Sequence, residues 1–124
     1  MAVSEQFNTL VLDLLGEVTA VSARRMFGGV GYYAGGLFFA LADDEQLYFR
    51  VDDSNRGDFT AEGMAAFSPM GPGSKSMSYF ALPPRLYDEP EELAQWTRRA
   101  IAVARRAPPK TSRSAPRAAP RRRR

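Results

Sequence analysis

The 124-residue sequence contains neither cysteine nor histidine. Without cysteine it forms no disulfide and has no thiolate nucleophile, so disulfide scaffolds and cysteine-dependent catalysis are excluded. Without histidine it lacks the side chain that most often acts as a general base near neutral pH and most often binds zinc. A Ser-His-Asp hydrolase is therefore excluded, and we expect a protein without enzymatic activity, cofactor or metal.

Long apolar stretches and a targeting signal are also missing. No apolar run approaches the length that crosses a bilayer. Glu5, Asp13 and Glu17 interrupt the apolar residues near the N-terminus, and no basic segment precedes them, unlike in a secretory signal peptide. The sequence therefore predicts a cytoplasmic protein with no membrane partner.

Acidic residues are absent from the end of the chain, and this absence divides the sequence in two. Residues 1–106 contain 10 Lys and Arg against all 14 Asp and Glu, a net charge of −4. Residues 107–124 contain 7 Lys and Arg and no acidic residue, a net charge of +7. The latter segment consists only of Ala, Pro, Ser, Thr, Lys and Arg, which cannot build a core. We predict one domain over residues 1–106 and a disordered basic tail over 107–124.

The first half of the domain has the pattern of one helix followed by strands. Ser4 is a suitable N-cap for a helix with an apolar stripe at helical spacing, namely Phe7, Leu10, Val11, Leu14 and Val18. Residues 24–33 combine bulky apolar side chains with three glycines, which predicts the first strand of a bent sheet, closely overlaid by a helix. Residues 37–42 and 46–51 follow after short turn sequences, so the three strands predict an antiparallel meander.

A short helix is expected next. Asp52 or Asp53 is suited to its N-cap, and the helix extends to about Glu62, where Gly63 fits the left-handed position that ends a helix. A fourth strand is expected over residues 64–68.

A fifth strand, over residues 77–82, and a last helix complete the domain. Asp88 and Glu91 have the spacing of a capping box at the start of that helix, and Trp96 belongs to its apolar stripe. The predicted fold is therefore α+β, with two layers in the order α-β-β-β-α-β-β-α and an antiparallel sheet covered by helices.

Several segments together resemble the N-terminal domain of the TfoX/Sxy family. The similarity covers about residues 5–104, is most specific in Met-Phe-Gly-Gly-Val-Gly, and rests on residues 24–31, 36–41, 47–52, 77–80 and 93–96. The resemblance implies the same α+β domain, no established catalytic residues, and a regulatory role linked to natural competence and transcription. Full-length competence regulators carry a second, helical domain where this sequence has its basic tail.

The glycine segment and the carboxylates each suggest chemistry and each have a simpler interpretation. A phosphate-binding loop joins a strand to a helix N-terminus, whereas Gly28 and Gly29 are followed by more strand-like sequence. We interpret these two glycines, with Trp96, as structural. Acid–base or metal-binding carboxylates are less well supported than a hairpin turn and a helix cap for Asp43, Asp44, Glu45, Asp52 and Asp53.

Two groups of residues in the predicted strands have both a structural interpretation and a binding interpretation. Arg24, Arg25 and Arg50 either pair with nearby carboxylates or form a small binding patch on a sheet face. Seven aromatic residues either form core or provide a stacking platform for single-stranded nucleic acid; the net acidic charge of the domain favours core. They are Phe27, Tyr32, Tyr33, Phe38, Tyr48, Tyr79 and Phe80.

The tail gives the strongest indication of function. An extended, proline-spaced basic segment neutralises phosphates without reading sequence. Its basic residues are Lys110, Arg113, Arg117, Arg121, Arg122, Arg123 and Arg124. Our leading hypothesis is a non-enzymatic regulatory or accessory protein with non-specific nucleic-acid binding through this tail. The alternatives are a merely solubilising tail and a module that binds a protein partner or a second copy of itself.

Overall fold

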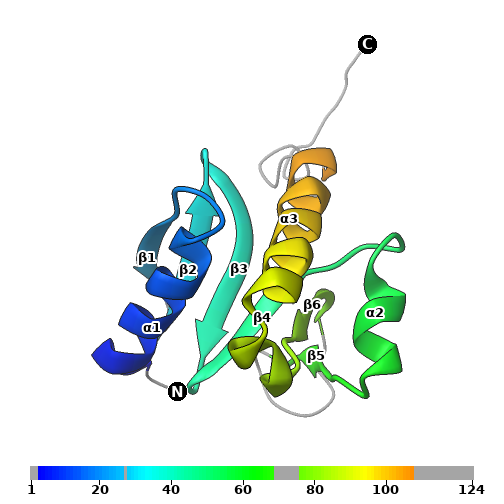
Figure 1. The fold of residues 1–124 in the computed structure, drawn as a ribbon, viewed down its shortest axis with the longest axis horizontal. Helices are drawn as coiled ribbons and strands as arrows, with labels where there is room; N and C mark the ends of the chain where they lie inside the picture. The colour runs from blue at the N-terminus through cyan, green and yellow to red at the C-terminus, as the bar shows by residue number, and fades with distance from the viewer. Residues whose placement is uncertain (1–2, 27, 69–75, 108–124) are drawn as a thin grey trace, which may run out of the picture.

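The computed structural model describes residues 3–26, 28–68 and 76–107, which form an open sheet and its covering helices (Figure 1). The predicted α+β fold is confirmed. In chain order the elements are α1 (Glu5–Gly16), β1 (Ser22–Met26), β2 (Gly29–Ala34), β3 (Leu37–Asp43), β4 (Gln46–Arg50), α2 (Arg56–Ala61), β5 (Ala66–Phe67), β6 (Ser76–Ala81), the 3₁₀-helix η1 (Pro84–Asp88) and α3 (Pro90–Arg106).

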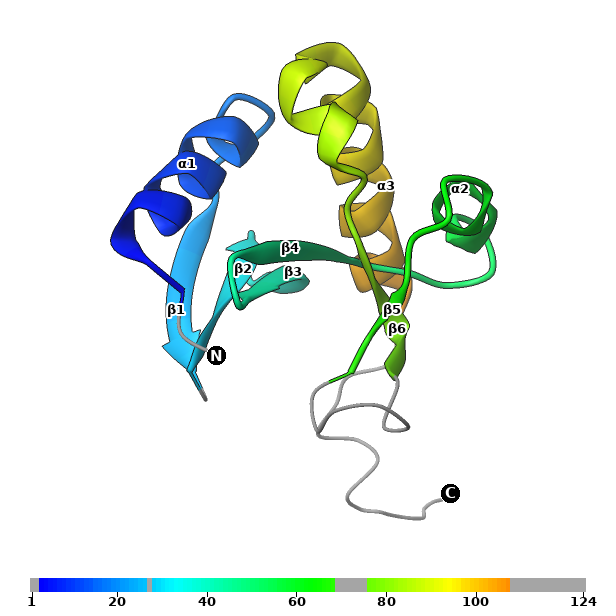
Figure 2. The same ribbon diagram turned by 90° about the horizontal axis from the view of Figure 1, so that it is seen from below.

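The sheet is antiparallel at every described pairing, with the strand order β1-β2-β3-β4-β6-β5. The first four strands are consecutive hairpins, as expected of a meander. The chain then forms α2 and returns, so that β6 pairs with β4 and the short β5 lies at the edge. Figure 2 shows α1 and α3 on the same side of the strands, which leaves the sheet with a helix-covered face and an outer face.

The single strand predicted over residues 24–33 is wrong, because this segment is a hairpin. Met26 pairs with Gly29 and Arg25 with Val30, so the chain reverses between β1 and β2. Gly28 has φ 82°, a left-handed conformation that costs other residues free energy and that short hairpin turns require. Gly28 therefore serves the turn, while Gly29 is a buried residue of β2.

The hydrophobic core lies between the sheet and the helices. Its largest completely buried side chains include Tyr32, Phe39, Phe49 and Leu47 of the strands. Helix α3 adds Leu93, Trp96, Ala100 and Val103, and helix α1 adds Val11 and Leu15. The expected stripe on α1 is partly wrong, since Leu10 is 44 % exposed and Leu15 is completely buried. The buried side of α1 therefore follows the four-residue spacing of Val11 and Leu15.

A bulge in β3 determines which aromatic side chains enter this core. Tyr32 pairs with Ala40, but its neighbour Tyr33 pairs with Phe38, so Phe39 is an extra residue in the ladder. Phe39 and Ala40 are both completely buried, and Phe39 contacts the ring of Phe49. Phe38 instead stacks on Tyr33. The bulge thus places the adjacent Phe39 and Ala40 on the same core-facing side, and Phe38, which regular alternation would put on that side with Ala40, on the outer face.

The helix caps in the second half also differ from those predicted. Helix α2 begins after Asn55, not after Asp52 or Asp53, and ends near Gly63, whose φ of 73° confirms the predicted left-handed position. The Asp88 capping box is wrong, because Asp88 lies in η1. Helix α3 starts at Pro90, a position at which proline loses no hydrogen bond.

Candidate nucleic-acid interface

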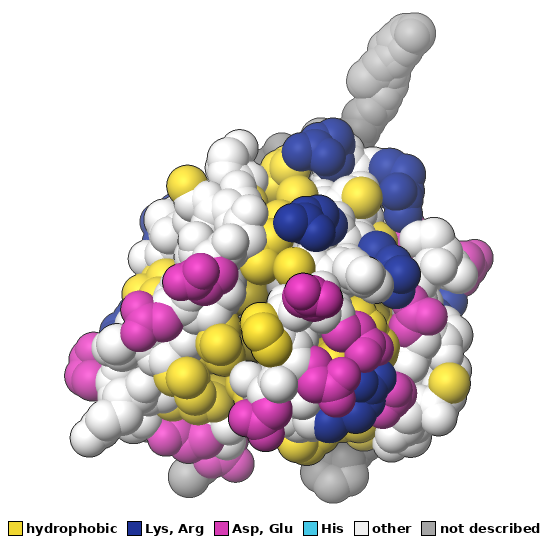
Figure 3. All heavy atoms as spheres, in the orientation of Figure 1, with side chains coloured by type: hydrophobic (Ala, Val, Ile, Leu, Met, Phe, Trp, Pro, Cys, Tyr) yellow, Lys and Arg dark blue, Asp and Glu magenta, His cyan; other side chains and the backbone are white. Residues whose placement is uncertain are grey.

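The C-terminal half of α3 presents a row of exposed arginines, which are Arg98, Arg99, Arg105 and Arg106. Residues seven apart lie two turns apart on one side of a helix, so these four side chains form two adjacent pairs. Figure 3 shows Lys and Arg side chains gathered over the C-terminal end of α3 and acidic side chains gathered over its other end. The helix therefore separates charge along its length.

Two of these arginines are neutralised by contacts and two are not. Arg99 pairs with Asp58 at 3.0 Å. Arg106 pairs with Asp52 at 3.0 Å and donates to the Ser54 hydroxyl at 2.8 Å. Within the part of the chain that the structure describes, Arg98 and Arg105 have no ion-pair or hydrogen-bond partner. These two guanidinium groups are available to an external anion.

After the first turn of α3, every charged residue up to the C-terminus is basic. No acidic residue follows Glu92, and residues 93–124 contain 11 Lys and Arg. Residues 1–92 contain the other 6 against all 14 acidic residues, a net charge of −8. The tail residues predicted to bind nucleic acid lie outside the described residues. The last acidic residue, Glu92, lies in the first turn of α3, so the change from acidic to basic sequence occurs near the start of this helix and before the arginine row.

The three strand arginines do not come together as one patch. Arg25 shares a sheet face with the buried Val30 and turns toward α1, where it donates to Glu5 at 2.8 Å and to the Val3 carbonyl at 3.3 Å. Adjacent residues of a strand point to opposite faces, so Arg24 lies on the outer face. Arg50 pairs with Tyr79 on β6, and two strands separate β1 from β4.

Arg50 lies within an aromatic row on the outer face, on the strand between those of Phe38 and Tyr79. The rings of Tyr33 and Phe38 stack at 5.1 Å, and those of Phe38 and Tyr79 are 5.6 Å apart. The Arg50 guanidinium lies 5.6 Å from the centre of the Tyr79 ring and donates to the Phe38 carbonyl at 3.4 Å. Burial raises the pKa of the Tyr79 hydroxyl, although Arg50 opposes the rise. The aromatic row therefore takes its rings from β2, β3 and β6, and the Arg50 guanidinium of β4 lies among them.

The other predicted aromatic residues are divided between the two faces. Tyr48 contacts Phe67 of β5 at 4.8 Å and pairs with Ala81, so it also belongs to the outer face. Tyr32 and Phe80 are buried core residues. Residue 27 lies outside the described residues. The sequence did not distinguish these groups, because the bulge in β3 alters the simple alternation.

The acidic residues considered as ligands make local contacts. Asp44 and Glu45 have φ of 52° and 61° and form the tight turn between β3 and β4. The Glu45 carboxylate accepts hydrogen bonds from Ser4, which lowers its pKa. Hydrogen bonding from Ser54, assisted by Arg106, lowers the pKa of Asp52. The described residues contain no group of three or more carboxylates placed to hold a metal ion.

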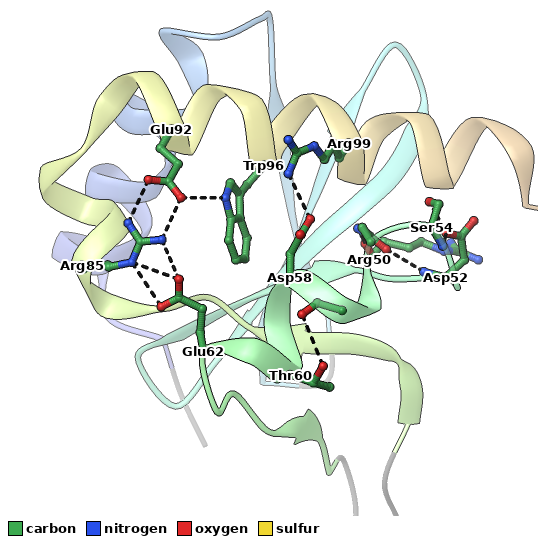
Figure 4. A network of polar contacts seen from close by, with 12 residues as sticks. Arg50, Asp52, Ser54, Asp58, Thr60, Glu62, Arg85, Glu92, Trp96 and Arg99 are labelled. Atoms are coloured by element: carbon green, nitrogen blue, oxygen red, sulfur yellow. Dashed lines mark hydrogen bonds and ion pairs between the residues drawn. The ribbon is translucent and has the colours of Figure 1, made fainter.

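A cluster that sequence reasoning missed joins α2, η1 and α3 around Arg85 (Figure 4). Its guanidinium pairs with Glu62 at 2.6 Å and with Glu92 at 2.7 Å. The same Glu92 carboxylate accepts from the Trp96 indole at 3.3 Å. Hydrogen bonds from Arg85 lower the pKa of Glu92 to about 2 and also lower that of Glu62. The spacing of these residues along the chain carries no recognisable pattern.

This cluster predicts a loss of stability in acid. Because the pKa of Glu92 falls from 4.5 to about 2 on folding, its ionised form favours the folded state. The contribution is complete above pH 4.5 and is lost as the pH falls toward 2. We expect the melting temperature to decrease over this range. In Arg85→Met the melting temperature should be lower at neutral pH and decrease less in acid. Arg98→Gln, which removes an arginine without a partner among the described residues, should follow the parent curve. Parallel curves for Arg85→Met and the parent would contradict the assignment.

Comparison with known proteins identifies a family for this chain. The family model of the TfoX N-terminal domain matches residues 13–104. The chain belongs to the TfoX N-terminal domain family. The comparison with curated proteins gives no match. The family match spans α2, η1 and most of α3, and it ends within the arginine row, two residues before Arg106.

No described helix is both long and apolar enough to span a membrane. Among the hollows on the described surface, one of about 490 Å³ lies beside the N-terminal turn of α3 and is lined mostly by glutamates. Another, of about 280 Å³, lies where Arg50 of β4 meets Arg106 and Ala107 at the end of α3. The second hollow adjoins the basic end of the molecule.

Proposed function

We propose that this TfoX N-terminal domain protein is a non-enzymatic accessory protein that contacts nucleic acid, without reading its sequence, through its basic end. The observation that carries the proposal is the separation of charge, −8 over residues 1–92 against +11 over residues 93–124. The described start of the basic segment is exposed and only partly neutralised. A regulatory role linked to competence or transcription is the extension that family membership supports.

Phosphate neutralisation explains why the basic end, rather than the whole molecule, would make the contact. Bringing cationic side chains to a polyphosphate releases condensed counterions, and this release dominates non-specific affinity. The acidic part repels the same polymer. A molecule divided in this way approaches nucleic acid with α3 and the tail foremost, and its acidic end directed away.

The test compares the parent with a full-length variant in which the seven tail Lys and Arg are replaced by Gln. We expect the parent to bind unrelated DNA sequences with Kd of about 10⁻⁴ to 10⁻⁶ M and a slope of log K against log salt of about −4 to −6. The variant should lose detectable binding in fluorescence anisotropy. A chain with the tail residues in shuffled order should bind like the parent. Sequence-selective binding that persists in the Gln variant would refute the proposal.

A second candidate function, docking of a protein partner, is favoured by a crevice between α1 and α3. It has a volume of about 230 Å³ and is lined in part by Leu14, Val18, Leu93 and Ala94. Figure 3 shows hydrophobic side chains at the surface between these two helices. A stoichiometric protein partner, or a stable dimer, retained by the Gln-tail variant would favour this second function.

A further inference from the structure

The outer face of the sheet has an aromatic surface that the proposed function does not require. Tyr33, Phe38 and Tyr79 follow one another across β2, β3 and β6, and Arg50 lies against the last ring. Helices α1 and α3 lie on the opposite side of the sheet (Figure 2). Tyr33 and Phe38 remain partly exposed, whereas the aromatic residues that face the helices, such as Phe39 and Phe49, are completely buried. The outer row therefore differs from the core in accessibility.

The geometry of the row suits a flat, unsaturated ligand. Tyr33 stacks on Phe38 with ring planes inclined by only 23°, and Tyr79 follows Phe38 with an inclination of 40°, so the three rings form one stack that a further flat ring can extend at the Tyr33 end. Nucleic-acid bases stack on such rings in proteins that bind single strands, and each stacked base contributes without regard to its identity. The bulge at Phe39 is what delivers Phe38 to this face.

The distribution of charge supplies the second requirement, a cationic path for the phosphates. Arg24 and Arg50 belong to the outer face. Beyond Arg50 lies the hollow of about 280 Å³, where Asp52 already pairs with Arg106, so Arg50 is the cation that this side of the row offers to a phosphate. At the other end of β4, Asp43 and Asp44 contribute to the raised pKa of the Tyr48 hydroxyl, which places negative charge there. On this face, positive charge therefore lies at the C-terminal end of β4, where Arg50 stands.

We propose that this face binds single-stranded nucleic acid, with a base stacked on Tyr33 at the end of the ring stack and the backbone running past Arg50. The inference rests on the proposed function and names its ligand class. Bases of a duplex are already stacked on one another and do not reach a flat sheet face, so duplex contacts the tail alone. The protein consequently prefers single strands to duplex of the same length.

The experiment measures anisotropy of a labelled oligothymidylate of about 12 nucleotides and of a labelled duplex of equal length, with the full chain. The test variants are Tyr33→Ser and Phe38→Leu, the latter of which keeps an apolar side chain but removes the ring. Tyr87→Leu, on η1, is the matched control for loss of an aromatic ring elsewhere. Melting temperatures establish that each variant is folded, and either test variant alone suffices if the other does not fold.

Each test variant should weaken oligothymidylate binding by about 5- to 100-fold and leave duplex binding unchanged, and Tyr87→Leu should affect neither. The fold decrease in oligothymidylate affinity should be similar at low and high salt, since stacking releases no counterions. Equal affinity of the parent for both probes, or unchanged binding by both test variants, overturns the platform while leaving tail binding intact. No binding of either probe by the parent refutes the proposed function itself. A dimer in the parent that both test variants abolish would instead assign this face to a second copy of the chain.

Discussion

Replacing Trp96 by alanine should lower the free energy of unfolding by about 3–5 kcal/mol. The side chain is only 6 % exposed, and its ring meets that of Phe59 edge-on at 4.7 Å. Removing it opens a cavity between α2 and α3 that the surrounding rings cannot fill. Because small domains are marginally stable, a loss of this size leaves much of the population unfolded. Urea denaturation followed by circular dichroism measures the change.

Trp96→Phe is the matched control, since it keeps a ring against Phe59 and loses the hydrogen bond to Glu92. It should cost clearly less than Trp96→Ala. In the parent the single tryptophan also reports its own environment, with blue-shifted emission and weak quenching by iodide. Red-shifted, freely quenched emission from the folded parent would show that this surface of α3 is exposed, contrary to the structure.

Replacing Asn55 by alanine should have the next largest effect, about 2–4 kcal/mol. Asn55 is only 2 % exposed, and its side chain joins the end of β4 to the start of α2. Its Oδ1 accepts from the Asp52 amide at 2.9 Å, and its Nδ2 donates to the Arg50 carbonyl at 3.1 Å. Alanine leaves both backbone groups without this partner, and the cost of an unsatisfied buried group exceeds the net value of the bond it lost.

The conservative variant Asn55→Asp separates the two contacts. It keeps an acceptor for the Asp52 amide but has no donor for the Arg50 carbonyl, so its stability should lie between those of the parent and Asn55→Ala. Thermal unfolding of the three proteins under one condition decides the order. If Asn55→Ala melts at the parent temperature, the side chain does not hold this connection.

Strand positions were predictable where alternation and turn residues agree. Residues 37–42 and 46–51 were expected as strands, and β3 and β4 occupy nearly those ranges. Residues 24–33 were misassigned because alternation continues through the turn, and nothing in the composition distinguishes a glycine at φ 82° from one within a strand. The N-cap at Asn55 was missed because aspartates immediately before it are equally good caps by residue type.

The candidate site was predictable in its charge but not in its surfaces. The absence of acidic residues after Glu92 is visible in the sequence and locates the basic end. Which aromatic residues remain accessible depends on one extra residue in β3, and sequence alternation cannot register such an insertion. The Arg85 cluster joins three elements through tertiary contacts, so residue spacing gave no sign of it.

The contact of Arg106 with Asp52 and Ser54 fixes the place at which the chain leaves the domain. Ala107 therefore lies beside Arg50, in the hollow that both residues line. If the tail binds a single strand as proposed, that strand meets the nearby outer face at an effective concentration of about the millimolar range. Two individually weak contacts then act as one stronger one. Asp52→Asn, which weakens the ion pair with Arg106, would reduce this avidity without changing either binding surface.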